Sequence, residues 1–194
     1  MRVYDEQKKT HFIVLQSHND IPVHDNRILS MKFSPENPDI LLTGSWDETV
    51  KVWDLRMGGV IKSIFGMKTY GDCLDIQDNV ILTGHNRDKK QLQLWDLGTY
   101  KVIEDIEWDP THNPATAYDN PVTAAKFSKN TSNYIVAFSG IAKQVRIFDR
   151  RNGNRLCHVQ STPGEVNSVD FFNTSDTFVY GGSLGALHSL KINQ

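Results

Sequence analysis

The sequence predicts an all-β protein assembled from repeated units of four short strands. The segment VWDL at 52–55 returns as LWDL at 94–97, which places Trp53 and Trp95 42 residues apart. Around both copies, short runs of alternating apolar and polar residues are separated by turn-forming residues, which is typical of strands and not of helices. Repeats of this length are typical of small sheets that pack against one another in series.

The strands of one unit can be followed in the first full copy of the repeat. Leu29, Met31 and Phe33 alternate with Ser30 and Lys32, so a first strand carries its apolar side chains on one face. Proline and small polar residues then mark a turn, and apolar runs mark the following strands. The unit continues with a turn at 34–39, a buried strand at 40–43, a turn at 45–48, a third strand at 49–54, a turn at 56–59 and a fourth strand at 60–65.

Weaker copies of the aromatic–acid pair extend the repeat along the whole chain. The pair is kept in YD at 4–5 and in RIFD at 146–149, whereas LHSLK at 187–191 keeps only the alternation. The chain is therefore interpreted as a single repeat region. Its predicted divisions are a partial unit at 1–16, full units at 17–66, 67–108 and 109–161, and a partial unit at 162–194.

Units of four strands with an aromatic–acid pair closing the third strand resemble the WD-repeat family, and the resemblance extends from Val3 to Ile192. It implies a β-propeller in which each unit is one blade, here a partial propeller of about four blades. We favour an open arc that is a fragment of a longer propeller. The alternatives are a ring that a second chain completes, and a small ring in which 11–16 pairs beside 185–192.

Composition and charge exclude several classes of function. The net charge of −2 gives no attraction to nucleic acid or to an anionic membrane surface. The first residues lack the apolar core of a signal peptide, and no stretch approaches the roughly 18 apolar residues of a membrane span. Cys73 and Cys157 are too few for a disulfide framework, which favours a cytoplasmic location, with a nuclear or cytoskeletal one as the alternative. His18 and His24 lack a cysteine partner, so we expect no metal and no cofactor.

In the WD-repeat family, a blade can carry buried hydrogen bonds between a histidine, a hydroxyl, an aspartate and the third-strand tryptophan. The resemblance implies that His24, Thr43, Asp47 and Trp53 hold these positions in the first full unit. Polar groups removed from water need such partners. The same side chains resemble a catalytic triad. A network that satisfies its own groups exposes no nucleophile, however, so we expect no catalytic residue and no enzyme.

The later units depart from this pattern. The second keeps Thr83 and Trp95, has Met67 or Tyr70 near the histidine position, and has Asp88 as a candidate for the aspartate. The third and fourth units lack the polar residue types and are expected to depend on packing. The resemblance therefore predicts one complete network, in the first full unit.

Trp46 stands in a turn at the rim where propellers commonly bind partners, and an exposed aromatic beside charges is a typical interface anchor. The competing interpretation is that Trp46 packs on the loop of the neighbouring blade. Mixed charge with a few aromatics favours a protein or peptide partner over a phosphate. The candidate partner-binding residues are Arg27, Leu29, Trp46, Tyr70, Asp72, Arg87, Glu165 and Asn167.

The segment WDLR at 53–56 resembles the WD-x-R box of WD-repeat substrate receptors of cullin-type ubiquitin ligases, in which the arginine contacts the ligase adaptor. FDRR at 148–151 is a looser copy, so Arg56 and Arg151 are the adaptor candidates. The competing interpretation is that both are solvated turn residues. The sequence thus predicts a non-enzymatic scaffold for protein interactions, with a ubiquitin-ligase substrate receptor as the first alternative and a hydrolase-like enzyme as the last.

Overall fold

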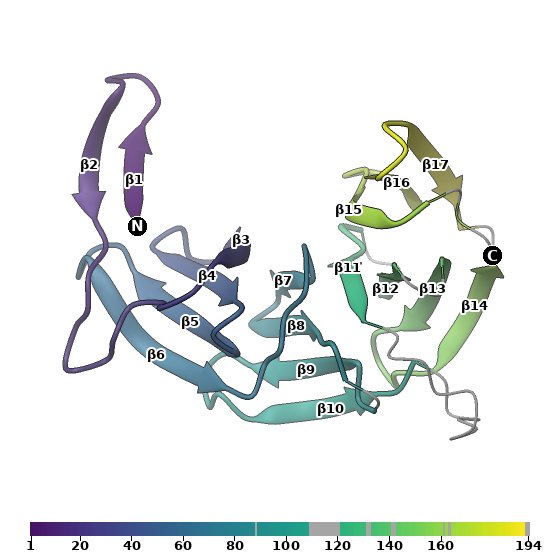
Figure 1. Ribbon diagram of the computed structural model, residues 1–194, viewed down its shortest axis with the longest axis horizontal. Coiled ribbons are helices and arrows are strands. Elements are labelled where there is room, and N and C mark those ends of the chain that lie inside the picture. The colour runs from purple at the N-terminus through teal and green to yellow at the C-terminus, as the bar shows by residue number, and fades with distance from the viewer. Residues whose placement is uncertain are drawn as a thin grey trace.

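The computed structural model describes residues 1–87, 89–108, 121–130, 133–140, 143–160, 162 and 164–192. Within these ranges the chain forms strands β1 to β17 and no helix, so the all-β prediction is confirmed. The strands make an N-terminal hairpin and four further sheets, which the chain visits one after another (Figure 1).

The hairpin pairs β1 (Arg2–Asp5) with β2 (Thr10–Val14). The remaining strands are β3 (Ile28–Phe33), β4 (Ile40–Ser45), β5 (Thr49–Asp54) and β6 (Gly59–Phe65) in the first sheet; β7 (Leu74–Gln77), β8 (Val80–Gly84), β9 (Leu92–Asp96) and β10 (Val102–Ile106) in the second; β11 (Val122–Phe127), β12 (Tyr134–Ser139), β13 (Gln144–Asp149) and β14 (Arg155–Gln160) in the third; and β15 (Val166–Phe171), β16 (Thr177–Gly182) and β17 (Leu187–Lys191) in the fourth.

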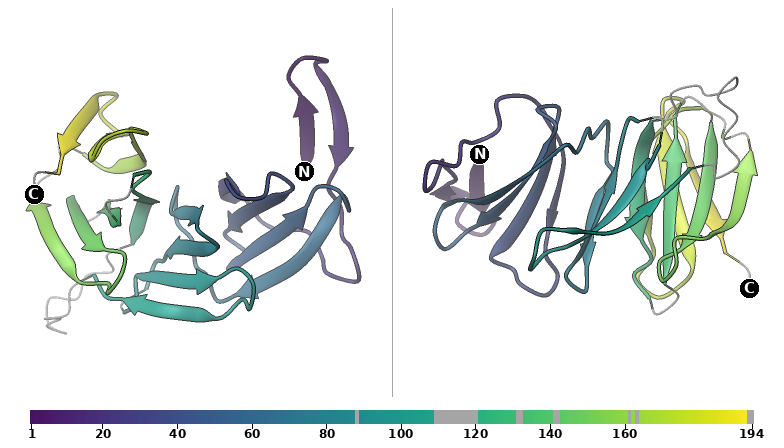
Figure 2. Two further views of the ribbon diagram at one scale, coloured as in Figure 1. Left: turned by 180° about the vertical axis from the view of Figure 1, so that it is seen from behind. Right: turned by 90° about the horizontal axis from the view of Figure 1, so that it is seen from below.

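The four sheets stand side by side along a curved arc, in the arrangement of propeller blades (Figures 1 and 2). Every sheet is an antiparallel meander, because strands that neighbour in sequence also pair. The first strand of each sheet lies towards the inside of the arc, and β6, β10 and β14 lie on its outside (Figure 1). The loops of all sheets therefore gather at the two ends of the strands.

Apolar side chains fill the spaces between neighbouring sheets. In β4, Ile40, Leu41 and Leu42 are all buried, although successive side chains point to opposite faces. Leu42 belongs to the core shared with the second sheet, whereas Leu41 packs with Trp53 beneath the hairpin. Because the sheet is covered on both faces at this point, Ile40 to Leu42 form a continuous apolar run that does not alternate.

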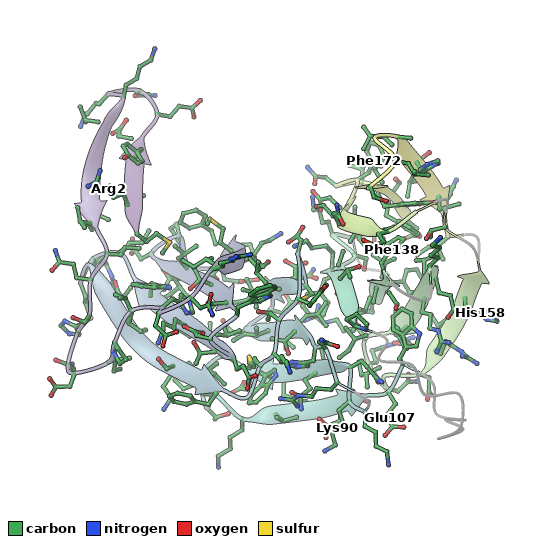
Figure 3. The ribbon with its side chains drawn as sticks, viewed as in Figure 1. Arg2, Lys90, Glu107, Phe138, His158 and Phe172 are labelled. Atoms are coloured by element: carbon green, nitrogen blue, oxygen red, sulfur yellow. The ribbon has the colours of Figure 1, made fainter. Side chains whose placement is uncertain are left out.

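Aromatic rings dominate the core between the third and fourth sheets. Phe138 of β12 is fully buried and points towards the fourth sheet (Figure 3). Its ring centroid lies 4.9 Å from that of Tyr180 and 6.1 Å from that of Phe178, both on β16. Such tilted and edge-on pairs are favourable beyond the apolar area that they bury. The weakly matching last repeats thus hold together through packing.

A single carboxylate joins all four sheets at their inner strands. Asp72, just before β7, accepts hydrogen bonds from Ser30 of β3 at 3.1 Å, from Lys126 of β11 at 2.6 Å and from Ser168 of β15 at 2.8 Å. The Lys126 side chain is nearly buried and also donates to the Leu74 carbonyl. The sequence predicts a partner-binding role for Asp72 at the rim, but its oxygens are committed to these contacts within the chain.

The predicted polarity of β3 is wrong in part. Met31 is 57% exposed and Phe33 49% exposed, whereas Ser30, which directly precedes Met31, is buried. Ser30 faces Asp72 and the second sheet, so the polar face is the covered one. The opposite face of the first sheet is covered by the hairpin only around Leu41 and Trp53. An alternating pattern shows which residues share a face, but not which face is packed.

The interpretation as a small closed ring is also wrong about strand pairing. It placed 11–16 beside 185–192, but β2 pairs with β1 at the other end of the arc. Leu15 is buried in the cluster under the hairpin with Trp53 and Val60. In the described part of the chain, β17 pairs only with β16. The hairpin therefore covers the first sheet and does not extend the fourth.

We predict that Asp72→Ala lowers the free energy of unfolding by about 3 kcal/mol, because it leaves the nearly buried Lys126 ammonium without its carboxylate. Urea denaturation of the purified chain measures the change. Asp170→Ala is the matched control, since it removes an exposed partner of Lys129 and should change the free energy by less than about 1 kcal/mol. Equal effects of the two substitutions would contradict the role given to Asp72.

Candidate functional site

The first sheet carries a chain of short polar contacts, which we call the first-sheet network: His24, Thr43, Asp47 and Trp53. Nδ1 of His24 lies 2.6 Å from Oδ2 of Asp47, and its Nε2 lies 2.7 Å from Oγ1 of Thr43. The same Thr43 oxygen accepts the indole N–H of Trp53 at 2.7 Å. The structure thus brings together the four residues that the family resemblance selected. They come from the segment before β3, from β4, from the following turn and from β5.

The charges of this network follow from burial and hydrogen bonding. Burial lowers the pKa of His24 below its ordinary value, although Asp47 acts in the opposite direction. Burial would raise the pKa of Asp47, but hydrogen bonds from Thr49 and His24 outweigh it and lower that pKa. A neutral His24 therefore donates Nδ1–H to the carboxylate and accepts the Thr43 hydroxyl proton at Nε2. Each side-chain polar atom of the first-sheet network then has a hydrogen-bond partner.

The contacts also reproduce the order of a hydroxyl–histidine–carboxylate triad, but the oxygen cannot reach a substrate. The side chains of His24 and Asp47 are 3% and 8% exposed, and Thr43 is fully buried. The Thr43 oxygen already accepts the Trp53 N–H. A nucleophile needs an open approach for the atom that it attacks. The arrangement can hold a turn in place, and it offers no position for a reacting group.

The second sheet has a related network that sequence analysis missed. Thr83 accepts the Trp95 indole N–H at 3.1 Å, and its oxygen lies 2.9 Å from Nε2 of His85. His85 is fully buried, and its burial together with the charge of Arg87 lowers its pKa to about 3. Met67 and Tyr70 hold no such position, and Asp88 lies outside the described residues. The sequence signal for this network is that His85 follows Thr83, the hydroxyl residue of β8, by two residues.

On the same end of the strands, Trp46 and Tyr70 form an exposed aromatic pair. Their ring centroids lie 6.5 Å apart, and the rings are tilted by 35°. Trp46 is 43% exposed and Tyr70 is 48% exposed. The guanidinium of Arg27 lies 4.9 Å from the centroid of the Trp46 ring, within the range of a cation–π contact. Three of the predicted partner-binding residues therefore lie together.

A hollow of about 270 Å³ opens beside these rings. We call it the Trp46–Tyr70 pocket, and it is lined by Trp46, Lys68, Thr69, Tyr70 and Asn86. The lining combines two aromatic surfaces with an ammonium, a hydroxyl and an amide. Such a lining can hold an apolar side chain and orient the polar groups beside it.

Backbone hydrogen bonds fix the walls of this pocket. The amide of Trp46 donates to the Arg27 carbonyl at 3.0 Å, and the amide of Asn86 donates to the Lys68 carbonyl at 3.0 Å. Thr69 donates its hydroxyl to the Ser45 carbonyl at 3.0 Å. Asp47 of the first-sheet network directly follows Trp46, and its amide donates to the Ser45 hydroxyl. The buried network and the exposed aromatic thus share one turn.

The other predicted partner-binding residues are distributed over the arc. Leu29 is half-buried on β3. Arg87 is half-buried near Gly66, and its charge acts on His85 and Asp105. Glu165 and Asn167 belong to the fourth sheet and line two other hollows there. The structure therefore brings Arg27, Trp46 and Tyr70 together and places the remaining predicted residues apart from them.

The two arginines proposed as ligase-adaptor contacts hold matching positions at the opposite end of the strands. Arg56 places its Nη2 2.9 Å from Oδ2 of Asp54, and Arg151 places its own 2.7 Å from Oδ2 of Asp149. These guanidinium contacts are the largest cause that lowers the pKa of each aspartate. Both arginine side chains are largely exposed. Each therefore stabilises its own turn and still presents a cation to solvent.

Two features of other functional classes are not found in the described residues. No group of three or more His, Cys, Asp or Glu side chains is placed there to hold a metal ion. Over the same ranges, no helix is long and apolar enough to cross a membrane.

Comparison with known proteins supports the fold and the repeat. The family profile described as "WD domain, G-beta repeat" matches residues 15–54, which include the first-sheet network. The chain belongs to the WD-repeat family. Proteins with this repeat generally bind other proteins, and the propeller generally is not an enzyme.

The relatives of this WD-repeat chain have varied names. It is 22% identical to "WD repeat-containing protein 89 homolog" of Dictyostelium discoideum, over 93% of this chain and 45% of that protein. It is 28% identical to "Protein Rae1" of Drosophila melanogaster, over 68% of this chain and 36% of that protein. The chain spans less than half the length of the curated relatives that it matches. Among solved structures, the computationally designed Ika4 protein is similar in fold, with a TM-score of 0.69 and 20% identity over 93% of this chain and 98% of that one.

We predict that Thr43→Val lowers the free energy of unfolding by about 3 kcal/mol. The change keeps the shape of the side chain but leaves the Trp53 indole N–H and Nε2 of His24 without a hydrogen-bond partner. Thermal and urea denaturation measure the loss. Thr174→Val, at an exposed turn, is the control and should stay within about 0.5 kcal/mol of the parent chain. A neutral Thr43→Val would mean that the network contributes no stability.

A second prediction concerns pH. The unfolded chain binds a proton at each histidine near pH 6.5, but folded His85 stays neutral down to about pH 3. The contribution of His85 is therefore complete above pH 6.5 and is lost as the pH falls, at about 1.4 kcal/mol per pH unit. His24, whose pKa is also lowered, acts in the same direction.

Urea denaturation at pH 7.5 and pH 5.0 measures this dependence, and His85→Gln should reduce it. Replacement of the exposed His158 by Gln is the control that should leave it unchanged. A stability that rises between pH 7.5 and 5.0 would contradict the prediction.

Proposed function

We propose that this chain is a protein-binding scaffold whose partner docks on the Trp46–Tyr70 pocket. The observation that carries the proposal is a pair of half-exposed aromatic rings beside a hollow, on loops that backbone hydrogen bonds hold in place. Exposed aromatics with a neighbouring arginine are typical anchors of protein interfaces. The family to which the chain belongs supports the general class of function and does not identify the partner.

Rigid presentation is the physical basis of this function. A loop that is already held by hydrogen bonds loses little conformational freedom when a partner binds. Trp46 follows Ser45 at the end of β4 and precedes Asp47, whose carboxylate is held by His24 and Thr49. The turn is therefore ordered before binding. The free energy gained by burying an apolar anchor on such a turn is therefore not reduced by a cost of ordering the loop.

We propose that catalysis is not part of this function. The first-sheet network, which resembles an active site, is buried, and its hydroxyl oxygen is occupied by the Trp53 N–H. A cytoplasmic location fits the small number of cysteines and stays a prediction.

A second candidate function is favoured by the pair of exposed arginine forks. Arg56 and Arg151 project from equivalent turns at the same end of the strands. Both keep donors available to solvent while pairing with an aspartate. This geometry is compatible with the adaptor contact of a ubiquitin-ligase substrate receptor. It lies at the opposite end of the strands from Trp46, so one chain has room for both contacts.

The two candidates can be separated by substitution. Trp46→Ala should reduce retention of the partner proteins of the parent chain by about thirtyfold, as expected for loss of a central anchor. Affinity chromatography with quantitative mass spectrometry measures the retention, with Met57→Ala at the opposite end of the strands as the control. Partners that survive Trp46→Ala and are lost with Arg56→Ala would replace the scaffold proposal by the ligase role.

A further inference from the structure

The first strands of the four sheets share one register, so equivalent positions in them can be compared. In each sheet, one residue of the first strand pairs with the fourth residue of the second strand: Met31, Leu74, Ala125 and Val169 in turn. Leu74, Ala125 and Val169 are buried in the cores that their sheets share with the preceding sheet. Met31, at the same position of the first sheet, is 57% exposed.

The same difference recurs two residues later. Phe127 and Phe171 are buried against the preceding sheet, whereas Phe33 is 49% exposed. The hairpin covers the outer strands of the first sheet, at Trp53 and Val60, and leaves β3 open. In the described part of the chain β1 pairs only with β2, so the inner edge of the hairpin is free (Figure 1). The inner half of this face therefore lacks the sheet that covers its equivalents.

The fourth sheet has a matching open face at the other end of the arc. Phe178 and Tyr180 of β16 point into the core shared with the third sheet, so Val179 between them points to the opposite face. Gly181 and Leu187, which pair with each other, lie on that face as well. A hollow of about 420 Å³ lies over it and is lined in part by Val179, Gly181 and Leu187. Leu187 is 80% exposed.

These two surfaces are complementary in shape and polarity. Met31 and Phe33 project from the first sheet, and the fourth sheet offers a hollow with an exposed leucine beside it. Exposed apolar surface of this kind marks an interface. Within the chain, each later sheet already packs its first strand against the sheet before it. A second copy of this chain therefore supplies, at each end, the kind of sheet that the other end lacks.

The lengths of similar solved structures agree with two copies. The designed Ika4 chain is matched over 98% of its length, whereas the designed Ika8 chain is matched over 52% of its length, with a TM-score of 0.71 and 20% identity. This arc thus also occurs as about half of a longer chain, and the rest of that chain has room for a second arc of the same size.

We propose that two copies of this chain join head to tail, with the fourth sheet of one copy packed on β3 of the other, inside the hairpin and beside the free edge of β1. This inference goes beyond the proposed function and does not depend on it. The contact joins two different surfaces, so a second, identical contact is needed to close the ring. Closure covers Met31, Phe33 and Leu187 in both copies. It also places two Trp46–Tyr70 pockets on the same end of the assembly, because the strands of both copies run in the same sense around the ring.

Analytical ultracentrifugation of the purified intact chain should show one species of twice the mass of the chain. Met31→Glu and Leu187→Glu each place a charge in the contact, and each should raise the dissociation constant of the dimer at least about tenfold. Both positions are exposed within one copy, so the fold should persist, which circular dichroism checks. Ile103→Glu, at an exposed position of β10 in the middle of the arc, is the matched control and should leave the dimer unchanged.

Mixing the two variants tests whether the contact joins different surfaces. The Met31→Glu chain keeps an intact fourth sheet, and the Leu187→Glu chain keeps an intact first sheet. Their mixture should form more dimer than either variant alone, because one of its two contacts is unchanged. A monomeric parent chain would overturn the inference, and so would a mass that grows with concentration beyond two copies, since the ring then does not close. Loss of the dimer with only one of the two variants would also overturn it, because the contact would then join equal surfaces.

Discussion

The carboxylate of Asp72 holds the inner edge of the arc together, because it accepts hydrogen bonds from side chains of the other three sheets. Each sheet otherwise contacts mainly its neighbours through apolar cores, as in other repeat architectures. A polar contact shared by all four sheets restrains their mutual angles in a way that adaptable apolar packing does not. The positions of the loops at both ends of the strands, and therefore of the candidate binding surface, depend on those angles.

The first-sheet network connects this framework to the surface. Buried hydrogen bonds hold Asp47, and the neighbouring residue Trp46 projects into solvent from the same turn. The residue that stabilises the turn and the residue that we propose binds a partner are therefore adjacent, but Asp47 is buried and Trp46 is exposed. A propeller blade can present an apolar anchor at low entropic cost for this reason: its polar interior has already ordered the loop.

The two ends of the strands use their charges differently. At one end, arginines fold back onto the aspartates of the aromatic–acid pairs and stabilise their own turns. At the other end, Arg27 lies over the Trp46 ring and Lys68 lines the hollow, while Glu48 lies 4.0 Å from Lys68. Arginine thus closes a turn at one end and covers an aromatic ring at the other.

The strands and the repeat could be predicted from the sequence, because strand periodicity and motif spacing are local properties of the chain. The residues of the first-sheet network came from the resemblance to the WD-repeat family. The sequence also selected Arg27, Trp46 and Tyr70 as candidates, but not their contact. The three-dimensional structure was needed to show that Asp72 contacts side chains of the other three sheets, that His85 serves the second sheet, that Met31 is exposed, and that the hairpin packs on the first sheet. Those outcomes depend on which sheet covers which face and on distances between residues far apart in sequence, and a local pattern contains neither.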